Sequence, residues 1–310
     1  MIAGRQAHPC RERRAFTLVE VLVVIGIIGV LLSILMPVLS KVRQQAYTAQ
    51  CASNLHTLGQ AWQMYVNANR GTCPPGRLPT AGAPGGVYDI GQGNEYRPRW
   101  YELLGEQLKQ YPNQNPRAQQ DDSWQIHNRL FLCPAVPDWN NSRNYPYGYN
   151  YQFLGNAHPR SSGHGSVNYP VKISRIRAGN TVMAADSIGT AAGKPKSQRS
   201  GYYADGSHDP AAQCNKGWCL DPPRLTGTSD YADAQHRDPA DRAGPDTRHQ
   251  GKCNVIFCDG HVELMAPGEM GYIVNPDGSM PVSGPGASNV MFSGLGADTD
   301  PPPIQAPGGS

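Results

Sequence analysis

The chain has 310 residues and a formal net charge of +3, and with 35 glycines and 28 prolines about one residue in five is Gly or Pro. Charged residues make up only 16% of the sequence, below the roughly 25% usual for soluble domains, which excludes a coiled coil or a polybasic nucleic-acid-binding protein. The Gly and Pro content predicts many turns and long loops rather than a compact helical enzyme. The negative mean hydropathy excludes a protein with many membrane spans but allows a single one.

Residues 16–39 form an apolar run, FTLVEVLVVIGIIGVLLSILMPVL, in which Glu20 is the single charged residue. As a helix, the run would span roughly 36 Å, enough to cross a bilayer core of about 30 Å. A secretory signal peptide is the alternative, but its apolar core is only about 7–15 residues long and a small-x-small cleavage site follows it. The basic residues that precede the run orient its N-terminal end towards the cytoplasm: Arg5, Arg11, Arg13 and Arg14.

Glu20 is the most informative residue of the run, because a carboxylate in a membrane helix costs about 2.5–3.5 kcal/mol and needs a partner. A cut before Phe16 would place a new α-amino group one helical turn from Glu20, where the two could pair. The segment Arg13–Glu20 (RRAFTLVE) resembles the recognition site of type IV prepilins and type II secretion pseudopilins. The resemblance implies cleavage between Ala15 and Phe16 by prepilin peptidase, N-methylation of Phe16, and Glu20 as the assembly carboxylate. The family usually has Gly where this chain has Ala15.

Gly29 and Pro37 also agree with the family, in whose filaments the helix loosens between two such residues. Proline removes a backbone donor and glycine lowers helix propensity, so both weaken the helix locally. Apolar residues continue at steps of three and four beyond Pro37, and Asn69-Arg70-Gly71 is a helix stop signal. We therefore expect one helix of about 50 residues, roughly 80 Å long, whose second half packs on a soluble domain.

The expected fold class is α+β: a long N-terminal helix, transmembrane in its first half, packed on a loop-rich antiparallel β-sheet domain, as in pilins. The expected boundaries are a prepilin leader at 1–15, a transmembrane helix at 16–39, its continuation at 40–70, a loop-rich domain at 71–295 and a disordered Pro/Gly tail at 296–310.

Within the domain, the sequence predicts few regular elements. Alternating tyrosines in Asn144–Leu154 indicate a strand whose aromatic face is half buried, with glycan contact as the weaker alternative. Asn254–Met265 reads as a β-hairpin on a two-residue Asp259-Gly260 turn. The other expected elements are a loop at Gly71–Gly93, an amphipathic helix at Arg99–Gln110, a strand at Asn180–Asp186, a surface loop at Ser187–Gln250 and a weaker hairpin around Asp277-Gly278.

A second resemblance involves His249, which precedes Asp259-Gly260 by nine residues. This His-x9-Asp-Gly spacing is similar to the signature of a bacterial subfamily of prepilin-type proteins, as are the segments Cys51–Leu55 (CASNL) and Phe131–Pro134 (FLCP). The subfamily pattern implies that Cys51 and Cys133 form a disulfide that ties the helix to the domain.

Eight cysteines are present, and cleavage would remove Cys10, leaving an odd number outside the cytoplasm, where disulfides persist. Cys214 and Cys219 could close a small loop. Cys253 and Cys258 lie five residues apart on one strand and point to opposite faces, so they are not expected to pair.

No metal and no cofactor are predicted. His249, Cys253, Cys258 and His261 are four zinc-type ligands within 13 residues, but strand alternation divides them between two faces. His249 is expected instead to hydrogen-bond to Asp259 or to a loop carbonyl. Residues 205–209 (DGSHD) could bind calcium, although their spacing is not that of an EF-hand. The sequence has no nucleophile elbow, phosphate loop or zinc-protease helix, so an enzyme is not expected.

The resemblance implies a structural subunit of a type IV pilus-like or type II secretion pseudopilus filament, held in the inner membrane by one helix with its C-terminal domain in the periplasm or at the cell surface. The implied partners are prepilin peptidase, other pilin or pseudopilin subunits, the inner-membrane assembly machinery and the lipid bilayer. The alternative is a surface protein, anchored by a pilin signal, that binds a ligand or glycan. The leader holds four arginines and Glu12, so the mature chain keeps 23 basic and 23 acidic residues and no nucleic-acid partner is expected.

Overall fold

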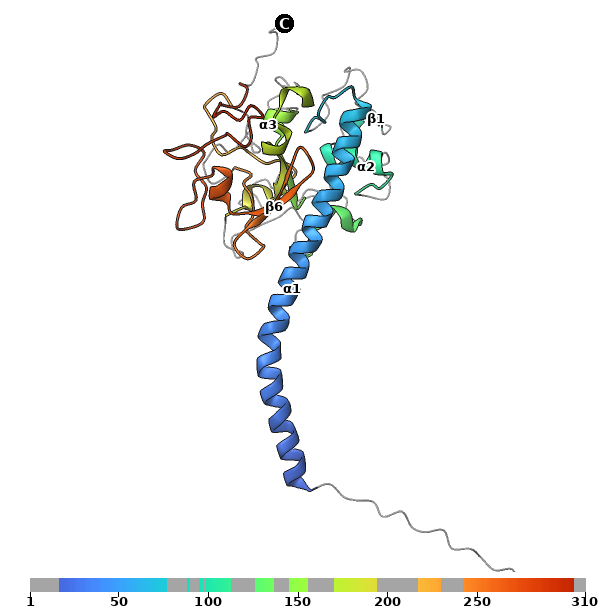
Figure 1. Ribbon diagram of the computed structural model, residues 1–310, viewed down its shortest axis with the longest axis vertical. Helices are drawn as coiled ribbons and strands as arrows, with labels where there is room; N and C mark the ends of the chain where they lie inside the picture. The colour runs from blue at the N-terminus through green and yellow to red at the C-terminus, as the bar shows by residue number, and fades with distance from the viewer. Residues whose placement is uncertain are drawn as a thin grey trace, which may run out of the picture. The chain divides into compact units, whose positions relative to one another are not determined.

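The computed structural model describes residues 17–76, 88–89, 95–96, 99–112, 126–136, 145–155, 170–193, 217–229 and 242–303. The chain divides into two units, residues 1–44 and 45–310, which are described separately. The architecture is α+β, with a long apolar N-terminal helix and a domain built on a four-stranded antiparallel sheet (Figure 1). This confirms the predicted fold class.

Helix α1 runs from Leu18 to Ala68 and passes through Gly29 and Pro37 without a break. Within the described residues, it is the one helix whose length and composition would let it cross a membrane. The predicted stop signal ends it, because Arg70 and Gly71 adopt positive φ angles of 55° and 76°. The N–H of Gly71 donates to the carbonyl of Val66 at 2.8 Å, which satisfies one of the free carbonyls at the helix end.

The main sheet has the strand order β3-β4-β5-β6, with every neighbouring pair antiparallel. The two central strands, β4 (Val182–Asp186) and β5 (Cys253–Phe257), are buried along their whole length. Strand β3 is Tyr147–Tyr149 and strand β6 is Val262–Met265. The predicted strand at residues 180–186 and the predicted C-terminal hairpin are therefore confirmed.

The hairpin turn is one residue longer than predicted. The N–H of Phe257 donates to the carbonyl of His261 at 3.0 Å, and the N–H of Gly260 donates to the carbonyl of Phe257 at 2.9 Å. The loop therefore has three residues, Cys258 to Gly260. Gly260 has a φ of 98°, which is the left-handed conformation that such a loop requires at its last position.

The tyrosine-rich segment is only partly a strand. The strand stops at Tyr149, and Tyr151–Leu154 form the short helix α3. Asn150 stands at the change of direction, where its side-chain amide donates to the carbonyls of Val182 and Phe292 at 2.9 and 3.0 Å. A side chain that bonds the backbone in this way competes with continued strand pairing. The tyrosines of this segment are buried rather than half exposed: Tyr145, Tyr147, Tyr149 and Tyr151.

Two predicted loops contain more structure than expected. The loop at residues 71–93 includes strand β1 (Tyr88–Asp89), which pairs with β2 (Glu95–Tyr96). The region from 187 to 250 was expected on the surface, but its described parts are largely buried, with Trp218, Leu220 and Ala243 in the core. Helix α2 (Trp100–Leu108) confirms the predicted amphipathic helix. Residues 275–279 form a turn without flanking strands in the described region.

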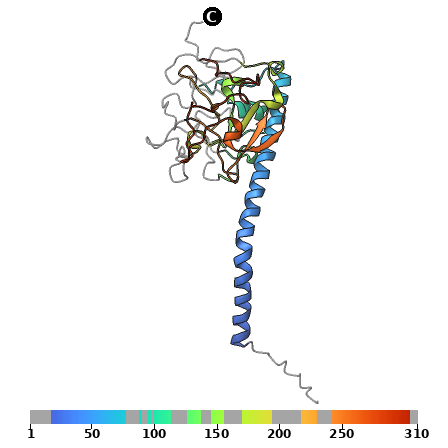
Figure 2. The same cartoon turned by 60° about the vertical axis from the view of Figure 1, so that its left-hand side comes forward.

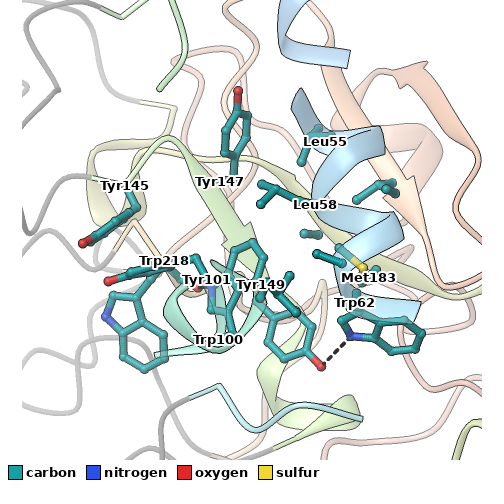
Figure 3. Packing of buried hydrophobic residues seen from close by; sticks show 14 of the residues in the cluster. Leu55, Leu58, Trp62, Trp100, Tyr101, Tyr145, Tyr147, Tyr149, Met183 and Trp218 are labelled. Atoms are coloured by element: carbon teal, nitrogen blue, oxygen red, sulfur yellow. Dashed lines mark hydrogen bonds between the residues drawn. The ribbon is translucent and has the colours of Figure 1, made fainter. Parts of the chain in front are cut away.

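Two apolar clusters cover the two faces of the sheet. One contains Leu55, Leu58 and Trp62 of α1 packed on Ile256 of β5, and the other contains Val255 and its neighbours on the opposite face. Both ribbon views show the C-terminal part of α1 beside the sheet (Figure 1, Figure 2). In the close view, the indole N–H of Trp62 donates to the hydroxyl of Tyr149 at 3.3 Å (Figure 3). Cys253 at the start of β5 and Cys258 directly after its end fall in different clusters, on opposite faces as predicted.

The first residues of the predicted C-terminal tail take part in a network of hydrogen bonds and ion pairs around Arg224. The guanidinium of Arg224 donates to Asp298 at 2.7 Å and to Asp300 at 2.8 Å, and the N–H of Asn289 donates to Asp298 at 2.8 Å. The backbone N–H of Asn289 and the Arg224 side chain both hold the pKa of Asp298 below its usual value. These groups are partly exposed, so each ion pair contributes at most about 1 kcal/mol.

Replacing Arg224 by alanine should therefore free residues 296–303 without unfolding the domain. We expect proteases to cleave this segment several-fold faster in Arg224→Ala, whereas the exposed-site control Arg175→Ala should leave the rate unchanged. Because the pKa of Asp298 is lowered on folding, its contribution is present above pH of about 4 and is lost as the pH falls through the folded-state pKa. Equal cleavage rates in the two variants would contradict this role.

Candidate functional site

The first turn of α1 contains the predicted assembly carboxylate. The N–H and the hydroxyl of Thr17 both donate to Oε2 of Glu20 at 2.8 Å, and the N–H of Glu20 donates to the Thr17 hydroxyl at 3.2 Å. This reciprocal pattern caps the helix N-terminus, where the helix dipole also favours a negative charge. Ala15 and Phe16 lie outside the described residues, so the cleavage site and the pairing of Glu20 with the Phe16 amine stay predictions.

The helix that follows exposes its apolar side chains on every side. Every residue from 17 to 46 is exposed, and Leu18, Val30 and Ile34 each expose more than half of their surface (80%, 62% and 64%). A continuous apolar surface of this kind is unfavourable in water and is stable only against lipid or other apolar helices. This segment is therefore suited to a bilayer or to a bundle of like helices.

A second cluster brings together residues that the sequence placed in separate motifs. Cys51 of α1, Cys133, Asp186 at the end of β4 and His249 before β5 each present one donor atom, and these four atoms lie within 4.8 Å of one another. All four residues are buried. The structure thus brings Cys51 and Cys133 together, as the subfamily pattern implied, as free cysteines. The predicted disulfide between them stays a prediction.

Asp186 carries the negative charge of this cluster and makes several hydrogen bonds. Arg248 donates to its Oδ1 at 2.6 Å, while the backbone N–H and the side-chain amide of Asn254 donate to its Oδ2 at 2.7 and 3.0 Å. Burial raises the pKa of Asp186, but the charge of Arg248 and the hydrogen bond from His249 outweigh it and hold that pKa below its usual value. The carboxylate is therefore ionised in the folded protein.

His249 is oriented by both of its ring nitrogens. Its Nδ1 lies 3.2 Å from the hydroxyl of Thr48 on α1, and its Nε2 lies 3.2 Å from Oδ2 of Asp186 and 3.8 Å from Sγ of Cys133. Burial lowers the pKa of His249, but the hydrogen bond to Asp186 outweighs it and raises that pKa to about 9.

The pKa values of the two cysteines are shifted in opposite directions, chiefly because of the hydrogen bond between them. Burial raises the pKa of Cys133, but its hydrogen bond with Cys51, the nearby charge of Arg248 and the hydrogen bond from His249 bring that pKa down to about 5. The hydrogen bond with Cys133 and burial raise the pKa of Cys51. The geometry therefore favours a thiolate at Cys133.

The other parts of the predicted motif lie elsewhere. Asp259 accepts a hydrogen bond from the ring of His261 at 2.6 Å, so the expected bond between His249 and Asp259 is wrong. The His261 ring stacks on Phe257 with the ring centroids 4.2 Å apart. Cys253 and Cys258 are buried on opposite faces, so the four-ligand set within residues 249–261 is not assembled.

Sequence reasoning missed Asp186, Arg248 and Thr48, although two signals were present. A single aspartate ends the apolar strand at residues 182–186, and an arginine directly precedes the motif histidine. Among the other predicted positions, Cys219 is buried, whereas its proposed partner Cys214 and the calcium candidate at residues 205–209 lie outside the described residues.

Comparison with known protein families finds a match at the N-terminal end of the chain. A model of the prokaryotic N-terminal methylation motif matches residues 10–36, which include Ala15, Phe16, Glu20 and Gly29. No curated protein and no solved structure matches the chain. The match supports a type IV pilin-like protein that prepilin peptidase processes, and together with the apolar helix it supports attachment to a membrane.

Proposed function

We propose that this protein is a structural subunit of a type IV pilus-like or type II secretion pseudopilus filament. Prepilin peptidase processes the subunit, and packing of its helix α1 against the helices of other subunits assembles the filament. One observation carries the proposal: the methylation motif at residues 10–36 overlaps a helix of 51 residues whose first half exposes apolar side chains on all sides. A targeting signal alone needs no helix of this length, whereas a filament core of packed helices does.

The assembly mechanism is packing of apolar helices with a charge that sets their register. Cleavage after Ala15 would remove the basic leader and create the amine of Phe16. That amine can pair with Glu20 of the same or a neighbouring subunit, which offsets the cost of a carboxylate in an apolar environment. The folded domain from residue 71 onward would then lie outside the inner membrane.

Mass analysis of the mature protein from its host tests this proposal directly. We expect the N-terminal peptide to begin at Phe16 and to carry one methyl group on its amine, and we expect the protein in sheared filament fractions. The matched control is Ala15→Gly, which restores the residue usual in the family and should give the same N-terminus. A mature protein that begins at Met1 would contradict processing, and recovery only as dispersed membrane monomers would contradict assembly.

The structure gives the glycan-binding alternative little support. That alternative relied on the tyrosine-rich strand and the long polar loop, but Tyr145, Tyr147, Tyr149 and Tyr151 are buried, as are most described residues between 187 and 250. Buried tyrosines cannot contact a sugar without unfolding of the segment. The filament role is therefore the function that the described residues favour.

A further inference from the structure

The buried cluster of Cys51, Cys133, Asp186 and His249 unites four segments that lie far apart in the sequence. We propose that these four residues bind one divalent metal ion of the zinc type and that the ion clamps α1 to the sheet. Their donor atoms lie within 4.8 Å of one another, and each residue is buried. The first ligand comes from α1, the second from the segment after the 3-10 helix Arg129–Phe131, the third from β4 and the fourth from the loop before β5.

The spacing of the donor atoms fits a tetrahedral ion. Zinc bonds of about 2.0 Å to nitrogen or oxygen and about 2.3 Å to sulfur set neighbouring donors roughly 3.3–3.8 Å apart around a tetrahedron. Nε2 of His249 lies 3.2 Å from Oδ2 of Asp186 and 3.8 Å from Sγ of Cys133. These two of the six edges are therefore already close to tetrahedral lengths, and the other donor pairs lie within 4.8 Å of one another.

The chemistry of the ligands selects the metal. Two cysteines and a histidine with one carboxylate suit zinc, whereas calcium and magnesium prefer oxygen ligands alone. Four protein ligands complete the coordination of zinc and leave no open position for substrate, which is typical of a structural site. Binding would release to solvent the proton of the Cys51 thiol and the proton on Nε2 of His249, with no change in oxidation state.

The residues around the cluster hold the ligands in place. The Thr48 hydroxyl contacts Nδ1 of His249 and leaves Nε2 directed at the cluster, which is the arrangement usual for a metal-binding histidine. Arg248 and Asn254 donate hydrogen bonds to the Asp186 carboxylate, and ligating carboxylates are commonly held in this way. Arg248 also supplies a positive charge beside the thiolates.

A disulfide between Cys51 and Cys133 is the competing arrangement, and the two exclude each other because a sulfur bonded to sulfur is no longer a thiolate ligand. A disulfide would require only the two cysteines. It would not account for the direction of the His249 ring or for the position of Asp186, both of which face the same point as the thiols. The metal accounts for all four side chains.

Metal analysis of the full chain, purified in detergent without added metal or chelator, tests the proposal. We expect about one zinc per chain, and at least a tenfold lower content in Cys133→Ala. The matched control is Cys258→Ala, which removes a buried cysteine outside the cluster and should keep the zinc of the wild-type protein.

Two measurements on the wild-type protein test for the bound metal even if Cys133→Ala does not fold. Replacement of the bound metal by Co²⁺ should give a thiolate-to-cobalt charge-transfer band, and a chelator should lower Tm by more than about 5 °C. A mass lower by two hydrogen atoms, with Cys51 and Cys133 linked by a disulfide and no metal bound, would overturn the proposal. So would free thiols that bind neither zinc nor cobalt.

Discussion

Replacing Arg248 by alanine is expected to destabilise the domain by about 3–5 kcal/mol. The Arg248 side chain is only 4% exposed, and the Asp186 carboxylate that it contacts is fully buried. Its guanidinium also reaches Asp246 at 3.3 Å and the carbonyl of Ser187 at 3.4 Å. Without the arginine, a buried carboxylate would keep its charge and lose one of its two cationic neighbours, with His249 as the other. This loss is far more costly than the loss of an exposed ion pair.

Urea unfolding of the full chain in detergent, followed by tryptophan fluorescence, measures this effect because Trp62, Trp100 and Trp218 are buried in the domain. Arg248→Lys should lower the free energy of unfolding less than Arg248→Ala, because lysine keeps the positive charge. Some loss should remain, because lysine lacks the planar guanidinium that contacts several acceptors. The exposed control Arg175→Ala should change stability by less than about 0.5 kcal/mol. A loss below about 1 kcal/mol in Arg248→Ala would show that the ion pair does not support the fold.

Loss of filaments in Glu20→Ala is the second large effect that we expect. An amine left without its carboxylate in an apolar helix bundle would cost about 3–5 kcal/mol, which weakens subunit association roughly 100-fold or more. The measurement is the amount of subunit in sheared filaments relative to the amount in the membrane. Glu20→Gln separates two roles, because it can still accept hydrogen bonds from Thr17 but carries no charge.

Thr17→Ala is the matched control for Glu20. It removes the hydroxyl that contacts the carboxylate and so weakens the helix cap by about 0.5–2 kcal/mol, but it leaves the charge available to the Phe16 amine. We expect Thr17→Ala to assemble and both Glu20 variants to fail. If Thr17→Ala failed as severely as Glu20→Ala, the carboxylate would act as a cap and not as the partner of the amine.

The local elements were predictable where a single signal governs them. The stop of α1 at Arg70 and Gly71 follows from the positive φ angles that glycine permits, and α2 and β4 follow from their apolar patterns. The hairpin at Asp259-Gly260 was predicted, but its loop length was not. Turn length depends on which residues pair across the strands, and here Phe257 pairs with His261.

Burial was harder to predict for the Gly- and Pro-rich segments. Residues between 187 and 250 have few apolar side chains, so they read as surface loops. Several of them are nevertheless buried because tertiary partners satisfy their polar groups: the carboxylate of Asp221 accepts hydrogen bonds from Tyr151 and from the N–H of Ala243, at 3.1 and 2.9 Å. Polar residues can enter a core when every group finds a partner, and a sequence does not list those partners.

The sequence by itself determined the N-terminal segment of this protein, up to the end of α1 at Ala68. The processing signal, the membrane-length helix and its carboxylate are all encoded within consecutive residues, because helix formation and insertion into lipid depend on local composition. Only the tertiary structure decided the buried cluster. Cys51, Cys133, Asp186 and His249 meet because α1 packs on the sheet and β4 pairs with β5, and contacts between such distant segments follow from the packing of the whole domain.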